Sequence, residues 1–131
     1  MSYDAKSISS MKSDTSWKSF CAIAYVAQEK SGVTDADAPV VLLVLQNQAG
    51  GLRFMIHPDL RKMFNGYDLE YLDAMLLDFV DRSKTHPNEL FRQISTIGGV
   101  GALVVRESGD DIAQCPKAIE MSRAFVDFTG L

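Results

Sequence analysis

The chain is poor in the residues that form disulfide frameworks and metal sites. Its 131 residues include two cysteines, Cys21 and Cys115, and two histidines, His57 and His86. One bridge between the cysteines is possible, but two free thiols in a reducing cytoplasm are the simpler expectation. The histidines and cysteines have no spacing typical of zinc sites. We therefore predict no metal site and no cofactor.

Long apolar runs and an excess of basic residues are also absent. The longest apolar runs fall far short of the roughly 20 residues of a membrane-spanning helix. Asp4 and Lys6 lie where a secretory signal would need an apolar segment. The net charge of −4 gives little attraction for nucleic-acid backbones or anionic membranes. These features predict a cytoplasmic protein with neither nucleic acid nor membrane as its partner.

The most informative segment that is present is an unbroken apolar run, Val-Val-Leu-Leu-Val-Leu, at residues 40–45. Strand side chains alternate between faces, so a strand without a polar face must be shielded from water on both sides. The last helix of the chain is one candidate for the second cover. Otherwise two subunits would press their sheets together. We predict this symmetric homodimer, because three helices do not readily cover both faces of a four-stranded sheet.

The remaining pattern predicts one α+β domain over residues 15–131, preceded by a flexible tail over residues 1–14. We expect a mostly antiparallel sheet of about four strands, in the order β-β-β-α-α-β-α, with helices packed on at least one face. The predicted strands cover residues 20–26, 40–45, 52–56 and 102–105, and the predicted helices cover 68–84, 87–94 and 116–129, after a helical turn at 58–64. A helix starting near Thr15 is the alternative to the first strand.

Several local features refine this prediction. Gly50-Gly51 supplies a positive φ for a hairpin between the second and third strands. The third strand alternates, which predicts a wetter side at Arg53 and Met55. Asp68 is the expected N-cap of the first long helix. Phe125 and Phe128 are expected in the last helix, because they continue its apolar spacing.

Four polar side chains are candidates for a ligand pocket between the sheet and the helices: His57, Tyr25, Arg53 and Cys115. His57 ends a strand, and histidine titrates near neutrality. Its alternative role is a bond from the ring to a backbone group. Cys115 precedes a helix, whose first amides stabilise a thiolate, whereas nearby acidic residues oppose that effect. A small ligand-binding domain or enzyme requires these groups to converge on one cavity.

Charge patterning suggests a second kind of function. Residues 53–62 are mainly basic, and residues 68–81 carry five acids and no base. Neighbouring patches of opposite sign suit a charged protein partner or self-association, and they equally suit pairing within the chain. The candidate interaction residues are Arg53, Arg61, Lys62, Glu70 and Asp73. Because no nucleophile–base set converges in the sequence, we predict a non-catalytic interaction or regulatory module, of the adaptor or inhibitor type.

Overall fold

A computed structural model describes residues 17–26, 38–97, 99–100 and 103–128 of the chain. The predicted tail over residues 1–14 lies outside these residues. The centre of the fold is a six-stranded antiparallel sheet in the order β4-β5-β1-β2-β3-β6. Its strands are β1 (Trp17–Tyr25), β2 (Val40–Asn47), β3 (Leu52–Ile56), β4 (Gly99–Val100), β5 (Leu103–Gly109) and β6 (Val126–Asp127).

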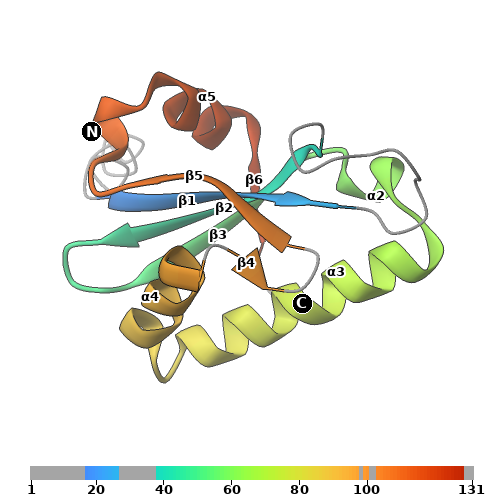
Figure 1. Ribbon diagram of the computed structural model, residues 1–131, viewed down its shortest axis with the longest axis horizontal. Helices are drawn as coiled ribbons and strands as arrows, with labels where there is room; N and C mark the ends of the chain where they lie inside the picture. The colour runs from blue at the N-terminus through green and yellow to red at the C-terminus, as the bar shows by residue number, and fades with distance from the viewer. Residues whose placement is uncertain (1–16, 27–37, 98, 101–102, 129–131) are drawn as a thin grey trace, which may run out of the picture.

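Helices cover both faces of this sheet (Figure 1). The helices are α2 (Leu60–Met63), α3 (Gly66–Ser83), α4 (Pro87–Ile97) and α5 (Pro116–Ala124), with a 3-10 turn, η1 (Ile112–Gln114). Figure 1 shows α3 and α4 on one side of the sheet and α5 on the other. The α+β class and the antiparallel sheet are confirmed. The four predicted strands correspond to the four longest, and the two-residue strands β4 and β6 extend the sheet at its edges.

The apolar run of β2 is buried on both sides, as predicted. Residues 41–45 are each at most 2% exposed. Leu42 and Val44 belong to the core beneath α3 and α4. Leu43 and Leu45 belong to a second core that includes Ala118 and Phe125 from the α5 segment. The chain therefore supplies both covers itself, which removes the packing argument for a dimer. Self-association stays a prediction.

β1 contains a register irregularity against each of its neighbours. Against β2, Ile23 pairs with Leu42 and Ala24 with Val40, so Val41 is the extra residue. Against β5, Ala22 pairs with Glu107 and Ile23 with Val105, so Arg106 is the extra residue. A bulge of this kind re-aims the side chains beside it. Val41 accordingly joins Leu42 in the core beneath α3.

The hairpin and the first strand agree with the sequence predictions. Residues 17–25 form a strand rather than a helix. Gly50 has φ +96°, and a Cβ there would lie 2.9 Å from Oδ1 of Asn88 at the start of α4. Glycine is favoured at this position by its positive φ, whereas the flexible side chain of Asn88 could move aside for a larger residue.

Three local predictions were wrong. Asn65 rather than Asp68 precedes the first residue of α3, and Asp68 lies inside the helix, buried against the sheet. Met55 is 6% exposed because α5 covers it, so the expected wetter side of β3 is restricted to Arg53. The last helix ends at Ala124, and the chain turns to pair β6 with β3, where Phe54 O accepts a hydrogen bond from Phe128 N at 2.8 Å.

Candidate functional site

Tyr25 lies on the α3 side of the sheet and is 1% exposed. Its hydroxyl donates a hydrogen bond of 2.6 Å to Oδ1 of Asp68, which is itself 6% exposed. The ring meets Phe64 edge-on, with 5.1 Å between centroids. Burial, followed by the hydrogen bond and charge of Asp68, raises the pKa of Tyr25 well above its usual range. Tyr25 therefore joins β1 to α3 and is not presented to a ligand.

Arg53 lies on the opposite side of the sheet, where its guanidinium joins β3 to β6. Its Nε and Nη2 atoms donate to the two carboxylate oxygens of Asp127 at 2.7 and 2.8 Å. The guanidinium also lies 6.0 Å from the ring centroid of Trp17. The hydrogen bonds from Arg53 lower the pKa of Asp127. This two-point ion pair stabilises the docking of a two-residue edge strand.

His57 follows β3, and its ring forms a hydrogen bond with a backbone group, which was the alternative role expected for it. Its Nδ1 accepts a hydrogen bond from the backbone N of Asp59 at 3.0 Å. The ring centroid lies 5.4 Å from that of Phe125, the residue after α5. His57 is therefore used to hold the turn before α2 against the end of α5.

Cys115 is half-buried at the other end of α5, in the predicted position before Pro116. Its thiol lies 3.8 Å from Oε2 of Glu107 on β5, within the range of a weak S–H···O hydrogen bond. This contact links the start of α5 to β5. Cys21 is fully buried, and burial raises its pKa to about 12.

These four side chains do not converge on one cavity. Tyr25 is separated from the other three by the sheet. Cys115 and His57 lie at opposite ends of α5, whose nine residues span about 13 Å. The part of the chain that the structure describes also contains no group of three or more side chains placed to hold a metal ion.

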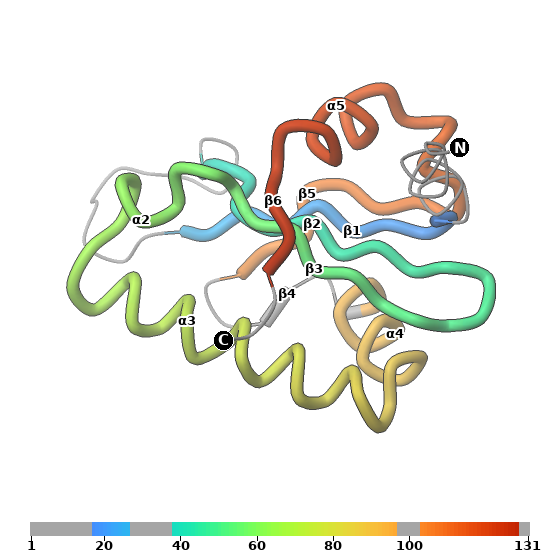
Figure 2. Tube along the Cα trace, turned by 180° about the vertical axis from the view of Figure 1, so that it is seen from behind, coloured from blue at the N-terminus to red at the C-terminus, as the bar shows by residue number. Residues whose placement is uncertain are grey.

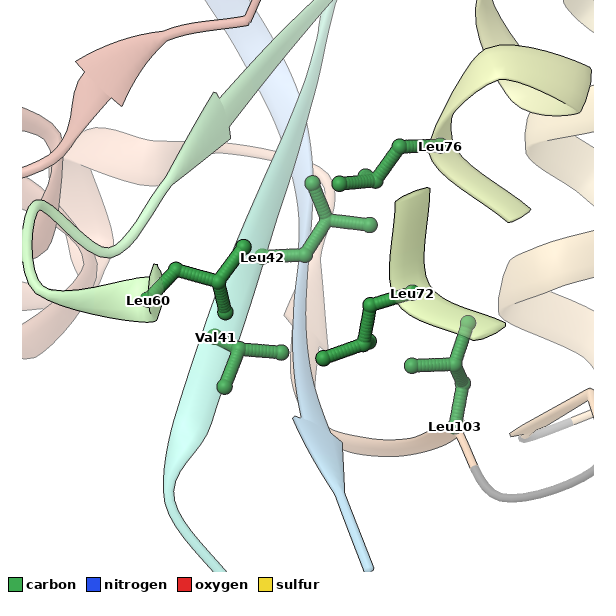
Figure 3. Close-up of a pocket in the computed structure, with 6 residues that line it drawn as sticks. All are labelled: Val41, Leu42, Leu60, Leu72, Leu76 and Leu103. Atoms are coloured by element: carbon green, nitrogen blue, oxygen red, sulfur yellow. The ribbon is translucent and has the colours of Figure 1, made fainter. Parts of the chain in front are cut away.

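The core contains a small void between β2 and α3, lined by six aliphatic side chains (Figure 3). They are Val41, Leu42, Leu60, Leu72, Leu76 and Leu103. Its volume is about 10 Å³, and none of these side chains has a polar atom. A void of this size and lining holds neither a ligand nor the hydrogen-bonded water of a polar site.

The basic segment and the acidic helix meet through one ion pair. Arg61 on α2 contacts Asp73 on α3 at 3.3 Å, and both are solvent-accessible. Within α3, Arg82 pairs with Asp78 at 3.4 Å. Lys62 and Glu70 are exposed. Part of the charge pattern is therefore neutralised within the chain, as one of the two interpretations predicted.

The outer face of α3 also carries exposed residues that take no part in these ion pairs. Figure 1 shows α3 running along the sheet with one side turned away from it. Its exposed residues include five at alternating spacings of three and four: Tyr67, Glu70, Ala74, Leu77 and Asp81. We call this set the α3 stripe. Tyr67 is 61% exposed and Leu77 is 43% exposed, so two of the large apolar side chains facing solvent lie on it.

Only Glu70 of the α3 stripe was among the predicted interaction residues. The spacing of the other four was readable in the sequence. They are the positions left over once the buried stripe of Leu72, Leu76 and Phe79 is assigned to the core. Tyr67 was missed because the helix was expected to begin after it.

Comparison of the chain with protein-family models, characterised proteins and solved structures finds no match in any of the three. Among the helices that the structure describes, none combines the length and apolar character needed to cross a lipid bilayer. The cytoplasmic location stays a prediction.

Proposed function

We propose that this protein is a non-catalytic interaction module that receives a basic amphipathic helix on the α3 stripe. The observation that supports it is the exposure of Tyr67 and Leu77 on a helical face that also carries the carboxylates of Glu70 and Asp81. Amphipathic helices are recognised through apolar anchors at such spacings, and flanking charges select the partner.

The spacing of the α3 stripe suits a helix as the partner. Steps of three and four residues keep side chains on one seam, which is the pattern of helices that pack side by side. Ala74 lies at the middle of the seam, between Tyr67 and Leu77, and its small side chain allows a close approach of two backbones. The α3 helix has 18 residues and therefore presents about 27 Å of surface.

The charges of α3 favour a basic partner. Arg61 and Arg82 pair with Asp73 and Asp78, respectively. No ion pair is recorded for Glu70 or Asp81 with any residue that the structure describes. These two exposed carboxylates lie on the seam itself, one on each side of Leu77. A helix with lysine or arginine opposite them would gain charge complementarity and a faster association.

The alternative of a pocket near His57 has less support. His57, Arg53, Tyr25 and Cys115 each have a partner within the fold, and they are spread over both sides of the sheet. Catalysis by these groups would require them to reach one substrate.

The proposal is tested with two synthetic helical peptides, each about three heptads long. Both carry leucine on one face; one is flanked by lysine and the other by glutamate. Fluorescence anisotropy measures their affinity for the full-length protein. The basic peptide should bind and weaken as salt is added, because the charges involved are solvent-exposed. The acidic peptide should bind at least about tenfold more weakly.

Charge-reversal variants test whether the basic peptide binds at the α3 stripe. Glu70→Lys with Asp81→Lys should reduce the affinity for the basic peptide at least about tenfold. Glu89→Lys with Asp110→Lys is the matched control, since both residues are exposed, lie off α3 and change the net charge equally. Equal binding of the two peptides, or equal losses in the two variants, would show that the α3 stripe is not the site.

A further inference from the structure

A second surface lies on the other side of the sheet, where an open groove separates α5 from the strands. Its volume is about 420 Å³, and it is lined by Val40, Arg106, Glu107, Lys117, Glu120 and Met121. We call it the α5 groove. This volume lies within the range of about 300–1,000 Å³ that is typical of small-molecule sites. In Figure 2, α5 lies over β5 and β1.

The register irregularity in β5 shapes the side of the α5 groove that the strands form. Arg106 is the extra residue between Val105 and Glu107, which pair with Ile23 and Ala22. Consecutive residues of a regular strand point to opposite faces, whereas a bulge allows two neighbours to share one. Arg106 and Glu107 accordingly both line the groove.

Both strand residues already have a contact at the groove wall, a hydrogen bond for Arg106 and a weak thiol contact for Glu107. The Arg106 guanidinium donates a hydrogen bond of 3.0 Å to the carbonyl of Ala38, beside Val40. The carboxylate of Glu107 lies 3.8 Å from the thiol of Cys115, at the start of α5. A wall whose charged groups are held in place loses less conformational entropy when a ligand binds.

The opposite wall of the groove, on α5, also carries one positive and one negative side chain. Lys117 and Glu120 are exposed on α5, three residues apart, and no ion pair is recorded for either with the described residues. The four ionic side chains contribute two positive and two negative charges. A ligand with one sign of charge would meet attraction and repulsion together, so neither a phosphate nor a metal cation suits this lining.

We propose that the α5 groove binds a small zwitterion with an apolar side chain, of the class of free amino acids. The ligand carboxylate would pair with Arg106 or Lys117, and its ammonium with Glu107 or Glu120. Val40 and Met121 supply the apolar contact. The proposal is independent of the helix partner, because the α3 stripe lies on the opposite side of the sheet (Figure 1).

The experiment titrates the ¹⁵N-labelled full-length protein with a pool of the standard amino acids, and then with each member that shifts its amide resonances. Shifts should concentrate at residues 106–107 and 117–121. The strongest binder is next compared with its N-acetyl and its amide derivatives, each of which retains one charge. Each derivative should bind at least about tenfold more weakly, because one half of the ionic recognition is lost.

Two matched double variants test whether amino-acid binding depends on the charges of the groove or on exposed charges elsewhere. Lys117→Gln with Glu120→Gln should weaken binding at least about tenfold. Glu89→Gln with Arg92→Gln removes an exposed pair of the same spacing on α4 and should leave binding unchanged. The proposal is overturned if no amino acid shifts the groove resonances, if the single-charge derivatives bind equally well, or if both variants bind like the wild type.

Discussion

The hydroxyl of Tyr25 on β1 donates a hydrogen bond of 2.6 Å to the carboxylate of Asp68 on α3, between two side chains that are nearly withdrawn from water. This bond connects residues 43 positions apart and fixes the first turn of α3 against the sheet. The position of the α3 stripe depends on that placement, because Tyr67 immediately precedes Asp68.

Removing the hydroxyl should destabilise the fold. Tyr25→Phe should lower the free energy of unfolding by about 1.5–3 kcal/mol, since it leaves a buried carboxylate without its donor. Asp68→Asn should also destabilise, because a neutral amide is a weaker acceptor. In a double-mutant cycle followed by urea denaturation, the two losses should be strongly non-additive. Additive losses would mean that the two side chains do not interact.

The same pair predicts a loss of stability in alkali. The pKa of Tyr25 is raised in the folded state by burial and by the carboxylate of Asp68. The stabilisation is therefore complete below the unfolded pKa of about 10 and is lost as the pH rises through the folded value. Urea denaturation between neutral pH and pH of about 11 should show a steeper decline for the wild type than for Tyr25→Phe. Parallel declines would contradict this assignment.

The ion pair between Arg53 and Asp127 predicts a loss of stability in acid. Arg53 lowers the pKa of Asp127, so the stabilisation is present above the unfolded pKa of about 3.9 and is lost as the pH falls through the folded value. The pair is partly exposed, so Asp127→Asn should cost about 0.5–1 kcal/mol at neutral pH. Denaturation at neutral pH and near pH 2 checks this, because the two proteins should converge in acid.

The two cysteines should differ in reactivity. Cys21 is fully buried and its pKa is raised to about 12, so it contains almost no accessible thiolate. A disulfide reagent near neutral pH should therefore modify only Cys115 in the folded protein and both thiols in denaturant. Cys115→Ser should abolish the native reaction. Rapid native labelling that persists in this variant would show that β1 is not buried as described.

Much of the fold could be predicted because periodicity reports burial directly. The run at residues 40–45 lacks a polar face, and β2 is indeed covered twice. The stripe of Leu72, Leu76 and Phe79 placed one side of α3 against the core. The Gly50-Gly51 hairpin followed from the backbone conformation that its turn requires.

Other features depend on contacts between distant residues and leave no local pattern. Asp68 was expected to cap a helix, but its position is set by Tyr25, which needs a buried acceptor. The last helix was extended too far, because Phe125 and Phe128 keep an apolar spacing while the chain turns to pair with β3. The bulge at Arg106 arises from the register of two strands, so the α5 groove could not be predicted from spacing.

The candidate site residues were the least predictable part. Arg53 and His57 were predicted as ligand-binding residues because their side chains are polar. Their hydrogen-bond partners within the fold could not be predicted, because Asp127 is distant in the sequence and the partner of His57 is a backbone group. Only Glu70 of the α3 stripe was identified, and it was identified from charge alone.

The most direct test of the account is an amide chemical-shift map of the ¹⁵N-labelled protein titrated with the basic helical peptide. We predict shifts that follow the α3 stripe, at Tyr67, Glu70, Ala74, Leu77 and Asp81, and that vanish in the Glu70→Lys, Asp81→Lys variant. Shifts that leave α3 unchanged while the peptide binds elsewhere would contradict the proposed function.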